Sequence, residues 1–279
     1  MIISLLHGII RLRYWLAGFG DLDLALDRCM LHAFQRHRPA ARHAVLFVHG
    51  LGTSSSSWIR VIPHLPGEYA ITCVDLPGYG FSRIQTGASF FTFDELVAAL
   101  EQLAATLGPK PIVLVGHSLG GWIAAQYAVH RPDRVKHLVL IDTAGIYYPG
   151  TEQQRTLFNV RTPREVRRLM KSLWYRYPVL FRPFAGSVLR ELERRGIHEF
   201  LQSVKNSDFL NGSLHALTMP VDVVWGENDR LISQESVEIM RREIPQLRFH
   251  TIQRCGHVPQ LERPLALASV LQSILSGVV

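Results

Sequence analysis

The sequence predicts an α/β fold, in which a mostly parallel β-sheet is covered by helices on both faces and a helical segment is inserted. Short apolar segments alternate with helix-length segments over residues 44–143 and again over residues 221–275. Such alternation indicates parallel strands joined by crossover helices. Residues 144–220 show helical patterns but no clear strand. We therefore expect a core made of residues 1–143 and 221–279, and a helical cap, or lid, made of residues 144–220.

Each predicted strand is short, apolar and followed by a turn. The strands are residues 44–48, 70–74, 112–115, 135–141, 221–224 and 247–252. The helices of the core are residues 57–65, 92–107, 119–130, 234–242 and 265–275. Thr92 and Glu95 form a capping box at the start of the second helix, and Gly108-Pro109 ends it. Residues 30–34 have the pattern of an antiparallel edge strand, although the region from 20 to 43 is ambiguous.

Composition narrows the class of protein. A chain of 279 residues with 47% hydrophobic residues and a mean hydropathy of +0.10 is typical of a soluble globular protein. Cys29, Cys73 and Cys255 are too few, and odd in number, for a disulfide framework, and they lack metal-ligand spacing. Phosphate-binding glycine motifs are absent as well. We expect a cytoplasmic protein that needs no metal or organic cofactor.

The first 19 residues form an apolar segment that is interrupted by Arg11 and Arg13. It is therefore too short to span a bilayer, which takes about 20 apolar residues. Its positive charge follows the apolar stretch, unlike that of a secretory signal. Apolar residues recur at helical spacing, at Ile2, Leu5, Ile9, Leu12 and Leu16. Two interpretations stay open: a helix packed on the main body, and an amphipathic helix lying in a membrane interface.

Charge is concentrated in the predicted cap. Residues 144–220 contain 12 Lys/Arg and 6 Asp/Glu, a balance of +6 out of the net charge of +7 for the whole chain. Because no basic tail or nucleic-acid-binding motif accompanies this charge, we expect no nucleic-acid partner. In residues 173–184, aromatic residues are interspersed with arginines. Aromatic side chains beside cations are typical of segments that lie at a water–lipid boundary. Either the rings pack the cap onto the core, or the cap meets an anionic membrane, with charge supplied by Arg164, Arg167, Arg168 and Lys171.

The most informative motif is Gly116-His117-Ser118-Leu119-Gly120, which lies between a predicted strand and a predicted helix. A serine on such a turn takes a strained backbone conformation, and its neighbours two positions away must be small. Its hydroxyl then projects from the sheet beside a helix N-terminus, where free N–H groups favour negative charge. The motif therefore predicts that Ser118 is a catalytic nucleophile.

A serine nucleophile needs a base, and the base needs an acid to orient it. Among 13 histidines, His257 follows the last predicted strand and lies in a loop that ends at Pro264. We predict His257 as the base. The acid is predicted to be Asp229, just past the strand at 221–224. The weaker candidates for the acid are Asp142, which we expect to fix a loop, Glu227 and Asp222. His49 and His117 are expected to be structural, and His130, His137 and His250 to lie at the surface or at strand ends.

Acyl transfer also requires N–H donors for the developing oxyanion. Leu119 directly follows the nucleophile, so its N–H is the first predicted donor. The second should come from the loop His49-Gly50-Leu51-Gly52, where glycines let the backbone turn toward the site. We predict the N–H of Leu51 as that donor.

Together these motifs resemble the α/β-hydrolase family over residues 44–264, except for the insertion. In family order they are His49–Gly52, Asp75–Ser82, Gly116–Gly121, Trp225–Asp229 and Gly256–Pro259. Within the family the chain looks most like bacterial lipases and esterases and monoacylglycerol lipases. It departs at Leu231-Ile232-Ser233, where many members have a proline soon after the acid.

The resemblance implies a serine carboxylic-ester hydrolase that acts on a lipid-like acyl ester through an acyl-enzyme. Ser118 argues against the family members that use an aspartate nucleophile, namely epoxide hydrolases and haloalkane dehalogenases. Two alternatives stay open. One is hydrolysis of a carbon–carbon bond in a ring-fission product, and the other is a non-catalytic ligand-binding protein on the same scaffold. The sequence does not indicate an oligomeric state.

Overall fold

The computed structural model describes the backbone of residues 2–85 and 90–278, and the side chains of these residues except 2–6 and 194. Within these residues, one nine-stranded sheet has the order β1-β2-β4-β3-β6-β7-β8-β9, and β5 pairs with β2. The strands are β1 (Gly20–Ala25), β2 (Cys29–Arg36), β3 (Ala44–Val48), β4 (Ala70–Asp75), β5 (Arg83–Ile84), β6 (Ile112–His117), β7 (Val135–Ile141), β8 (Val221–Gly226) and β9 (Arg248–Ile252). The six strands from β4 to β9 along this order are parallel, whereas β1, β2 and β5 pair antiparallel.

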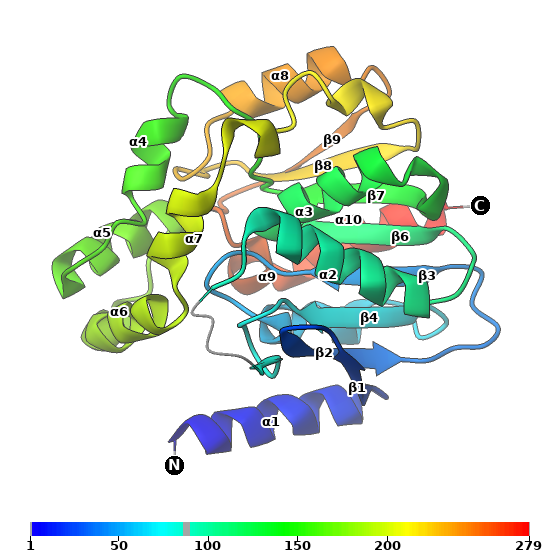
Figure 1. The fold of residues 1–279 in the computed structure, drawn as a ribbon, viewed down its shortest axis with the longest axis horizontal. Helices are drawn as coiled ribbons and strands as arrows, with labels where there is room; N and C mark the ends of the chain where they lie inside the picture. The colour runs from blue at the N-terminus through cyan, green and yellow to red at the C-terminus, as the bar shows by residue number, and fades with distance from the viewer. Residues whose placement is uncertain (1, 86–89, 279) are drawn as a thin grey trace.

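Helices cover both faces of the sheet, as the alternation of elements predicts (Figure 1). Outside the segment between β7 and β8, the α-helices are α1 (Ile2–Leu16), α2 (Phe93–Thr106), α3 (Leu119–His130), α8 (Glu235–Glu243), α9 (Pro259–Glu262) and α10 (Pro264–Ser276). Leu46 and Val48 of β3 belong to the apolar cluster that includes α2, α3 and α8. Val45 and Phe47 belong to the cluster that includes α10 and Tyr14 of α1. Successive residues of one strand thus enter opposite cores, and this confirms the sheet's two-sided burial.

Two expected elements differ from the structure. Residues 57–65 are not one helix but parts of two 3₁₀ turns, Ser55–Trp58 and Ile62–His64. Pro63 explains the interruption, because proline lacks an N–H and its ring clashes with the preceding helical turn. Residues 30–34 are in an antiparallel strand, as expected, but it is not at the edge: β2 lies between β1 and β4. The edge strand β1 was missed, although its apolar residues alternate with polar ones as in a strand that buries one face.

The segment between β7 and β8 is helical, and no strand occurs in its described residues. Its helices are α4 (Thr151–Thr156), α5 (Pro163–Leu173), α6 (Ala185–Arg194) and α7 (Ile197–Ser203). Figure 1 shows them grouped at the left of the sheet. We call residues 142–220 the inserted segment. The helical content expected there is present, while the division into a core and a cap stays a prediction.

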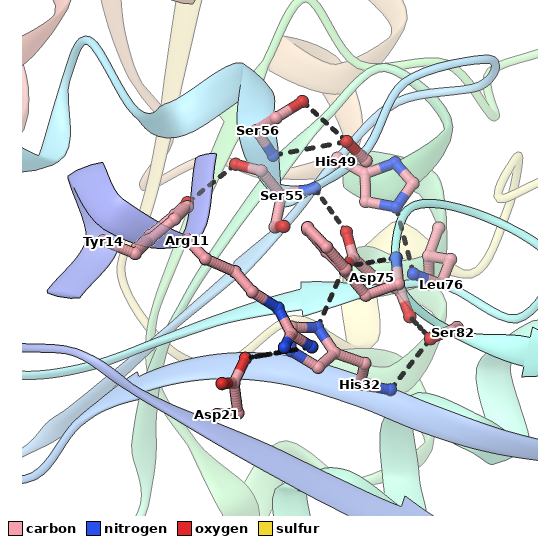
Figure 2. A network of polar contacts seen from close by, with 12 residues as sticks. Arg11, Tyr14, Asp21, His32, His49, Ser55, Ser56, Asp75, Leu76 and Ser82 are labelled. Atoms are coloured by element: carbon pink, nitrogen blue, oxygen red, sulfur yellow. Dashed lines mark hydrogen bonds and ion pairs between the residues drawn. The ribbon is translucent and has the colours of Figure 1, made fainter. Parts of the chain in front are cut away.

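A buried polar network joins α1 and β2 to the turn that follows β3 (Figure 2). The Asp75 carboxylate accepts hydrogen bonds from the Ser55 N–H at 2.7 Å and from the His32 ring at 3.0 Å. The other ring nitrogen of His32 contacts Asp21 at 2.8 Å, and the Tyr14 hydroxyl donates to the Ser55 carbonyl at 2.7 Å. Burial opposes a charge on His32, but its bonds to Asp75 and Asp21 outweigh burial and raise its pKa. The network fixes the backbone just downstream of Leu51.

The outer face of α1 is apolar and exposed. Ile9, Leu12 and Leu16 of the predicted stripe point to solvent, as does Trp15, which is 68% exposed. Ile2 and Leu5, the other members of the stripe, lie outside the residues whose side chains are described. Tyr14, which is not in the stripe, is buried and faces the body. The three described members of the stripe, Ile9, Leu12 and Leu16, therefore do not pack on the core. In the described part of the chain, no helix is long and apolar enough to cross a membrane.

Candidate active site

Ser118 lies at a tight turn between β6 and α3, with φ +53° and ψ −119°. A positive φ is rare for residues other than glycine, and such strained conformations are typical of functional sites. Two glycines make the turn possible. A Cβ on Gly116 would lie 2.3 Å from the Gly120 carbonyl oxygen, and a Cβ on Gly120 would lie 2.4 Å from the backbone oxygens of Val48 and His49. No side chain fits at either position, so the small residues of the motif have a steric cause.

The structure brings the predicted nucleophile, base and acid together. The Ser118 Oγ lies 2.9 Å from His257 Nε2, and His257 Nδ1 lies 2.8 Å from Asp229 Oδ2. Because a carboxylate only accepts, His257 donates from Nδ1, which leaves Nε2 to accept the Ser118 proton. The side chains of His257 and Asp229 are shielded from solvent. This arrangement can abstract a proton from the serine hydroxyl and stabilise the resulting imidazolium.

The Asp229 carboxylate is fixed by its own loop. Its Oδ1 accepts hydrogen bonds from the backbone N–H groups of Leu231 at 2.7 Å and Ile232 at 3.1 Å. These residues form the stretch that lacks the family's proline, so both N–H groups take part in holding the carboxylate. With His257, Asp229 therefore accepts from three donors, which fix the position of its carboxylate.

The loop that carries His257 is bonded to the inserted segment. The His257 N–H donates to the Leu173 carbonyl at 2.8 Å. Glu262 of α9 accepts from the Gly256 N–H at 2.8 Å and from the Tyr175 N–H at 2.9 Å. A Cβ on Gly256 would lie 2.6 Å from both the Leu173 oxygen and the Tyr175 nitrogen. Sequence reasoning missed Glu262, because it lies 87 positions from Tyr175 in the chain.

Two histidines near the site are structural, as predicted. His117 donates from Nε2 to the His257 carbonyl at 2.7 Å, and burial lowers its pKa to about 3. His49 accepts the Leu76 N–H at its Nε2, and burial lowers its pKa to about 4. Both rings are thus neutral at physiological pH, and neither contacts Ser118 in a way that would make it a base.

In the described part of the chain, the His257 ring is hydrogen-bonded to Ser118 and Asp229 and to none of the other acid candidates. Glu227 is exposed, and its carboxylate accepts the Arg254 N–H. Asp222 is fully buried and contacts His137, His250 and Arg248. The expectation that His137 lies at the surface or a strand end was wrong: it is buried against Asp222, which comes from the neighbouring strand β8. Asp142 lies beside Asp229, and its Oδ1 accepts the Gly226 N–H at 2.8 Å.

A pocket of about 670 Å³, counted with its open mouth, adjoins Ser118. Leu51 and Leu119, the predicted oxyanion donors, both contribute to its wall. Leu119 is the first residue of α3, so its N–H has no acceptor within the helix. The rest of the wall is largely aromatic and aliphatic, contributed by Trp122, Ile146, Tyr148, Phe158, Phe200, Leu201, Val204, Phe209, Leu231 and Ile232. Arg155 is the one residue of the wall with a full charge.

Only one group of His, Cys, Asp and Glu in the described residues is close enough together to hold a metal ion, namely Asp142, Asp229 and His257. Within it, His257 Nδ1 and Asp229 Oδ2 are already hydrogen-bonded to each other. These atoms therefore orient the base rather than present a free ligand set.

Known proteins share both the sequence pattern and the fold. The family model described as alpha/beta hydrolase fold matches residues 43–264. Human monoacylglycerol lipase ABHD6 is 25% identical over 265 residues, covering 87% of this chain and 78% of that protein. A 2-hydroxymuconate semialdehyde hydrolase from Pseudomonas sp. (strain CF600) is 25% identical over 256 residues, covering 86% of this chain and 89% of that protein.

Among solved structures, a crystal structure titled as a membrane phospholipase A and bacterial virulence factor superposes with a TM-score of 0.85. It is 25% identical and covers 99% of this chain and 92% of that chain. The range matched by the family model, residues 43–264, contains the Ser118 turn, the Asp229 loop and His257. This chain therefore belongs to the α/β-hydrolase fold family.

Proposed function

We propose that this protein is a serine carboxylic-ester hydrolase that acts on lipid-like acyl esters. The observation that carries the proposal is the chain of contacts from Ser118 Oγ through His257 to Asp229, at the wall of a largely apolar pocket. Relatives that are named as lipases lend further support. The pocket can bury an acyl chain, because apolar surface gains free energy when it leaves water.

In the proposed reaction, Ser118 Oγ attacks the ester carbonyl while His257 Nε2 takes its proton. The N–H groups of Leu51 and Leu119 stabilise the tetrahedral oxyanion, and Asp229 stabilises the imidazolium. His257 then gives the proton to the leaving alcohol, and an acyl-Ser118 ester remains. A water molecule, deprotonated by His257, attacks this ester. Collapse of the second tetrahedral intermediate releases the acid and restores the Ser118 hydroxyl.

A second candidate reaction is hydrolysis of a carbon–carbon bond in a ring-fission product. Two observations favour keeping it. One is the similarity to a 2-hydroxymuconate semialdehyde hydrolase over most of both chains. The other is Arg155, the single charged residue in the pocket wall, a cation that suits a substrate with a carboxylate although its guanidinium already contacts Glu152 and the Leu201 carbonyl. The ester reaction is preferred because the remaining wall is largely apolar.

We also propose that the protein works at a membrane surface on the cytoplasmic side. Its support is the outward apolar face of α1 and a second apolar ridge in the inserted segment, Val179, Leu180, Phe181 and Phe184, of which Leu180 is 82% exposed. Basic residues accompany both, with Arg13 on α1 and Arg182 within the ridge. Exposed apolar side chains flanked by cations are typical of segments that bind anionic lipid surfaces.

The test is hydrolysis of p-nitrophenyl esters from acetate to palmitate, with a dienoate ring-fission product assayed in parallel. We expect activity on the longer esters, abolished in Ser118→Ala and retained in Ser276→Ala, a control at an exposed serine on α10. Cleavage of the dienoate alone would favour the carbon–carbon reaction. A folded protein that hydrolyses neither substrate, and whose Ser118 does not react with a fluorophosphonate, would contradict both and favour a binding role.

A further inference from the structure

Asp142 is a buried carboxyl group that the proposed reaction does not use. It directly follows β7, at the same sheet edge as Ser118, and its side chain is fully shielded from solvent. Its backbone has φ +41°, a conformation that residues other than glycine rarely adopt. Strain of this kind persists only where the surrounding contacts require it.

The two oxygens of Asp142 differ in their surroundings. Oδ1 accepts the Gly226 N–H at 2.8 Å. Oδ2 is buried and has no hydrogen-bond donor in the described part of the chain. Ligand atoms of Asp142, Asp229 and His257 all lie within 4.8 Å of one another. A buried carboxylate oxygen without a donor is costly, whereas a protonated oxygen beside a carboxylate has a ready acceptor.

The groups that face Asp142 make a second negative charge unfavourable. They are Asp229 from the loop after β8, Glu262 from α9, and Cys255 and His257 from the loop after β9. Among them only His257 can carry a positive charge, and it is already paired with Asp229. Two adjacent buried carboxyl groups, of which only Asp229 is bonded to the imidazole, cannot both ionise easily, so one of them keeps its proton.

The donors decide which group keeps it. Asp229 accepts from three N–H groups, those of Leu231, Ile232 and the His257 ring. Asp142 accepts from one. Because Oδ2 of Asp142 has no donor among the described residues, we assign the retained proton to that oxygen. Burial, followed by the charge of Asp229, raises the pKa of Asp142 well above its ordinary value, in agreement with this assignment.

We propose that Asp142 is a neutral carboxylic acid whose Oδ2 proton is donated to the Asp229 carboxylate, and that it thereby acts as a positioning residue for the acid of the active site. The pair carries one negative charge, which matches one imidazolium. If both were ionised, the extra charge would make His257 more basic. An imidazole that already holds a proton on Nε2 cannot accept the Ser118 proton.

The test compares Asp142→Asn with Asp142→Ala. Asparagine is neutral, can accept the Gly226 N–H through its oxygen and can donate to Asp229 through its amide nitrogen. We expect Asp142→Asn to leave the acid limb of the kcat/KM pH profile within about 0.3 pH unit of wild type and to lower kcat less than about tenfold, because no charge is removed. Asp142→Ala should lower kcat at least about ten times further, since Asp229 loses its donor. Asp133→Asn, at an exposed acid, is the control.

A shift of the acid limb to lower pH by about one unit or more in Asp142→Asn would overturn the proposal, because it would show that a charge next to His257 had been removed. Equal losses in the Asn and Ala variants would overturn it too, because they would show that the donor has no role.

The measurements of kcat and of the kcat/KM pH profile depend on the proposed ester hydrolysis. Two readouts do not: the infrared band of a protonated carboxyl group, expected in wild type and absent from Asp142→Asn, and the titration of the His257 ring by NMR. Absence of that band in wild type would overturn the proposal whatever the substrate. Its presence in a protein without esterase activity would support the acid pair while the proposed function fails.

Discussion

The sheet edge around Ser118 and the inserted segment are built under opposite constraints. At the sheet edge, backbone passes so close to backbone that a single Cβ on Gly116 or Gly120 would collide with it. In the inserted segment, the ridge from Val179 to Phe184 is exposed, and most of the basic side chains of α5 project into solvent. The comparison teaches that the reaction chemistry depends on contacts that few sequences satisfy. The proposed contacts with substrate and membrane depend on surfaces that many sequences can provide.

The strongest test of the sheet edge is Asp229→Asn. We expect kcat to fall by about 10⁴-fold, because an amide in place of the carboxylate disrupts the orientation and tautomer of the histidine. Glu227→Gln removes the exposed carboxyl two residues earlier in the same loop and should keep kcat within about threefold, as surface substitutions usually do. Ester hydrolysis is measured for both variants under single-turnover conditions. An equal loss of activity in the two would show that the assignment of Asp229 as the acid is wrong.

The steric side of the comparison is tested by Gly120→Ala. Its methyl group would meet two backbone oxygens at 2.4 Å, and neither can move without displacing β3. We expect the free energy of unfolding to fall by about 3 kcal/mol, at the upper end for an overpacked site, as measured by urea denaturation. Gly67→Ala is the matched control, because nothing lies within 4 Å of its added methyl group. A loss below about 1 kcal/mol at Gly120 would mean that the turn can relax.

The surface side is tested by removing charge from the exposed residues Arg164, Arg168 and Lys171 of α5. Replacement of all three by glutamine should weaken binding to anionic vesicles at least about tenfold, since each basic residue near such a surface contributes about 1 kcal/mol. Replacement of Leu12, Trp15 and Leu16 of α1 by serine should weaken binding to neutral vesicles as well. Hydrolysis of a short soluble ester should not change in either variant. If both variants cosediment with vesicles as much as the wild-type protein does, the proposed membrane role is wrong.

The parts of the site whose geometry depends on residues adjacent in sequence could be predicted from the sequence. Ser118 was predictable because its two neighbouring glycines and the flanking strand and helix are contiguous. Asp229 and His257 were predictable because each follows a strand, and the carboxyl ends of parallel strands meet at one edge. In each case the geometry that matters is set by a few adjacent residues.

Partners far along the chain could not be predicted. The burial of His137 depends on Asp222, 85 residues away, and the support of His257 depends on Leu173. The direction in which α1 turns its apolar stripe is set by Tyr14, whose hydroxyl bonds to Ser55. Helical periodicity identifies an apolar face but not what lies opposite it, because that depends on tertiary contacts.

The inserted segment leaves the sheet at β7 and returns at β8, and these strands are paired neighbours, with Leu138 opposite Val221. Closing a flexible loop costs entropy that grows only with the logarithm of its length, so a tenfold longer connection adds about 2 kcal/mol. The junction can therefore accept segments of very different size. A replacement segment must nevertheless supply a carbonyl where Leu173 meets the His257 N–H and an N–H where Tyr175 meets Glu262. Chimaeras that exchange this segment should keep their reactivity when those two backbone groups are rebuilt, whatever the rest of the segment contains.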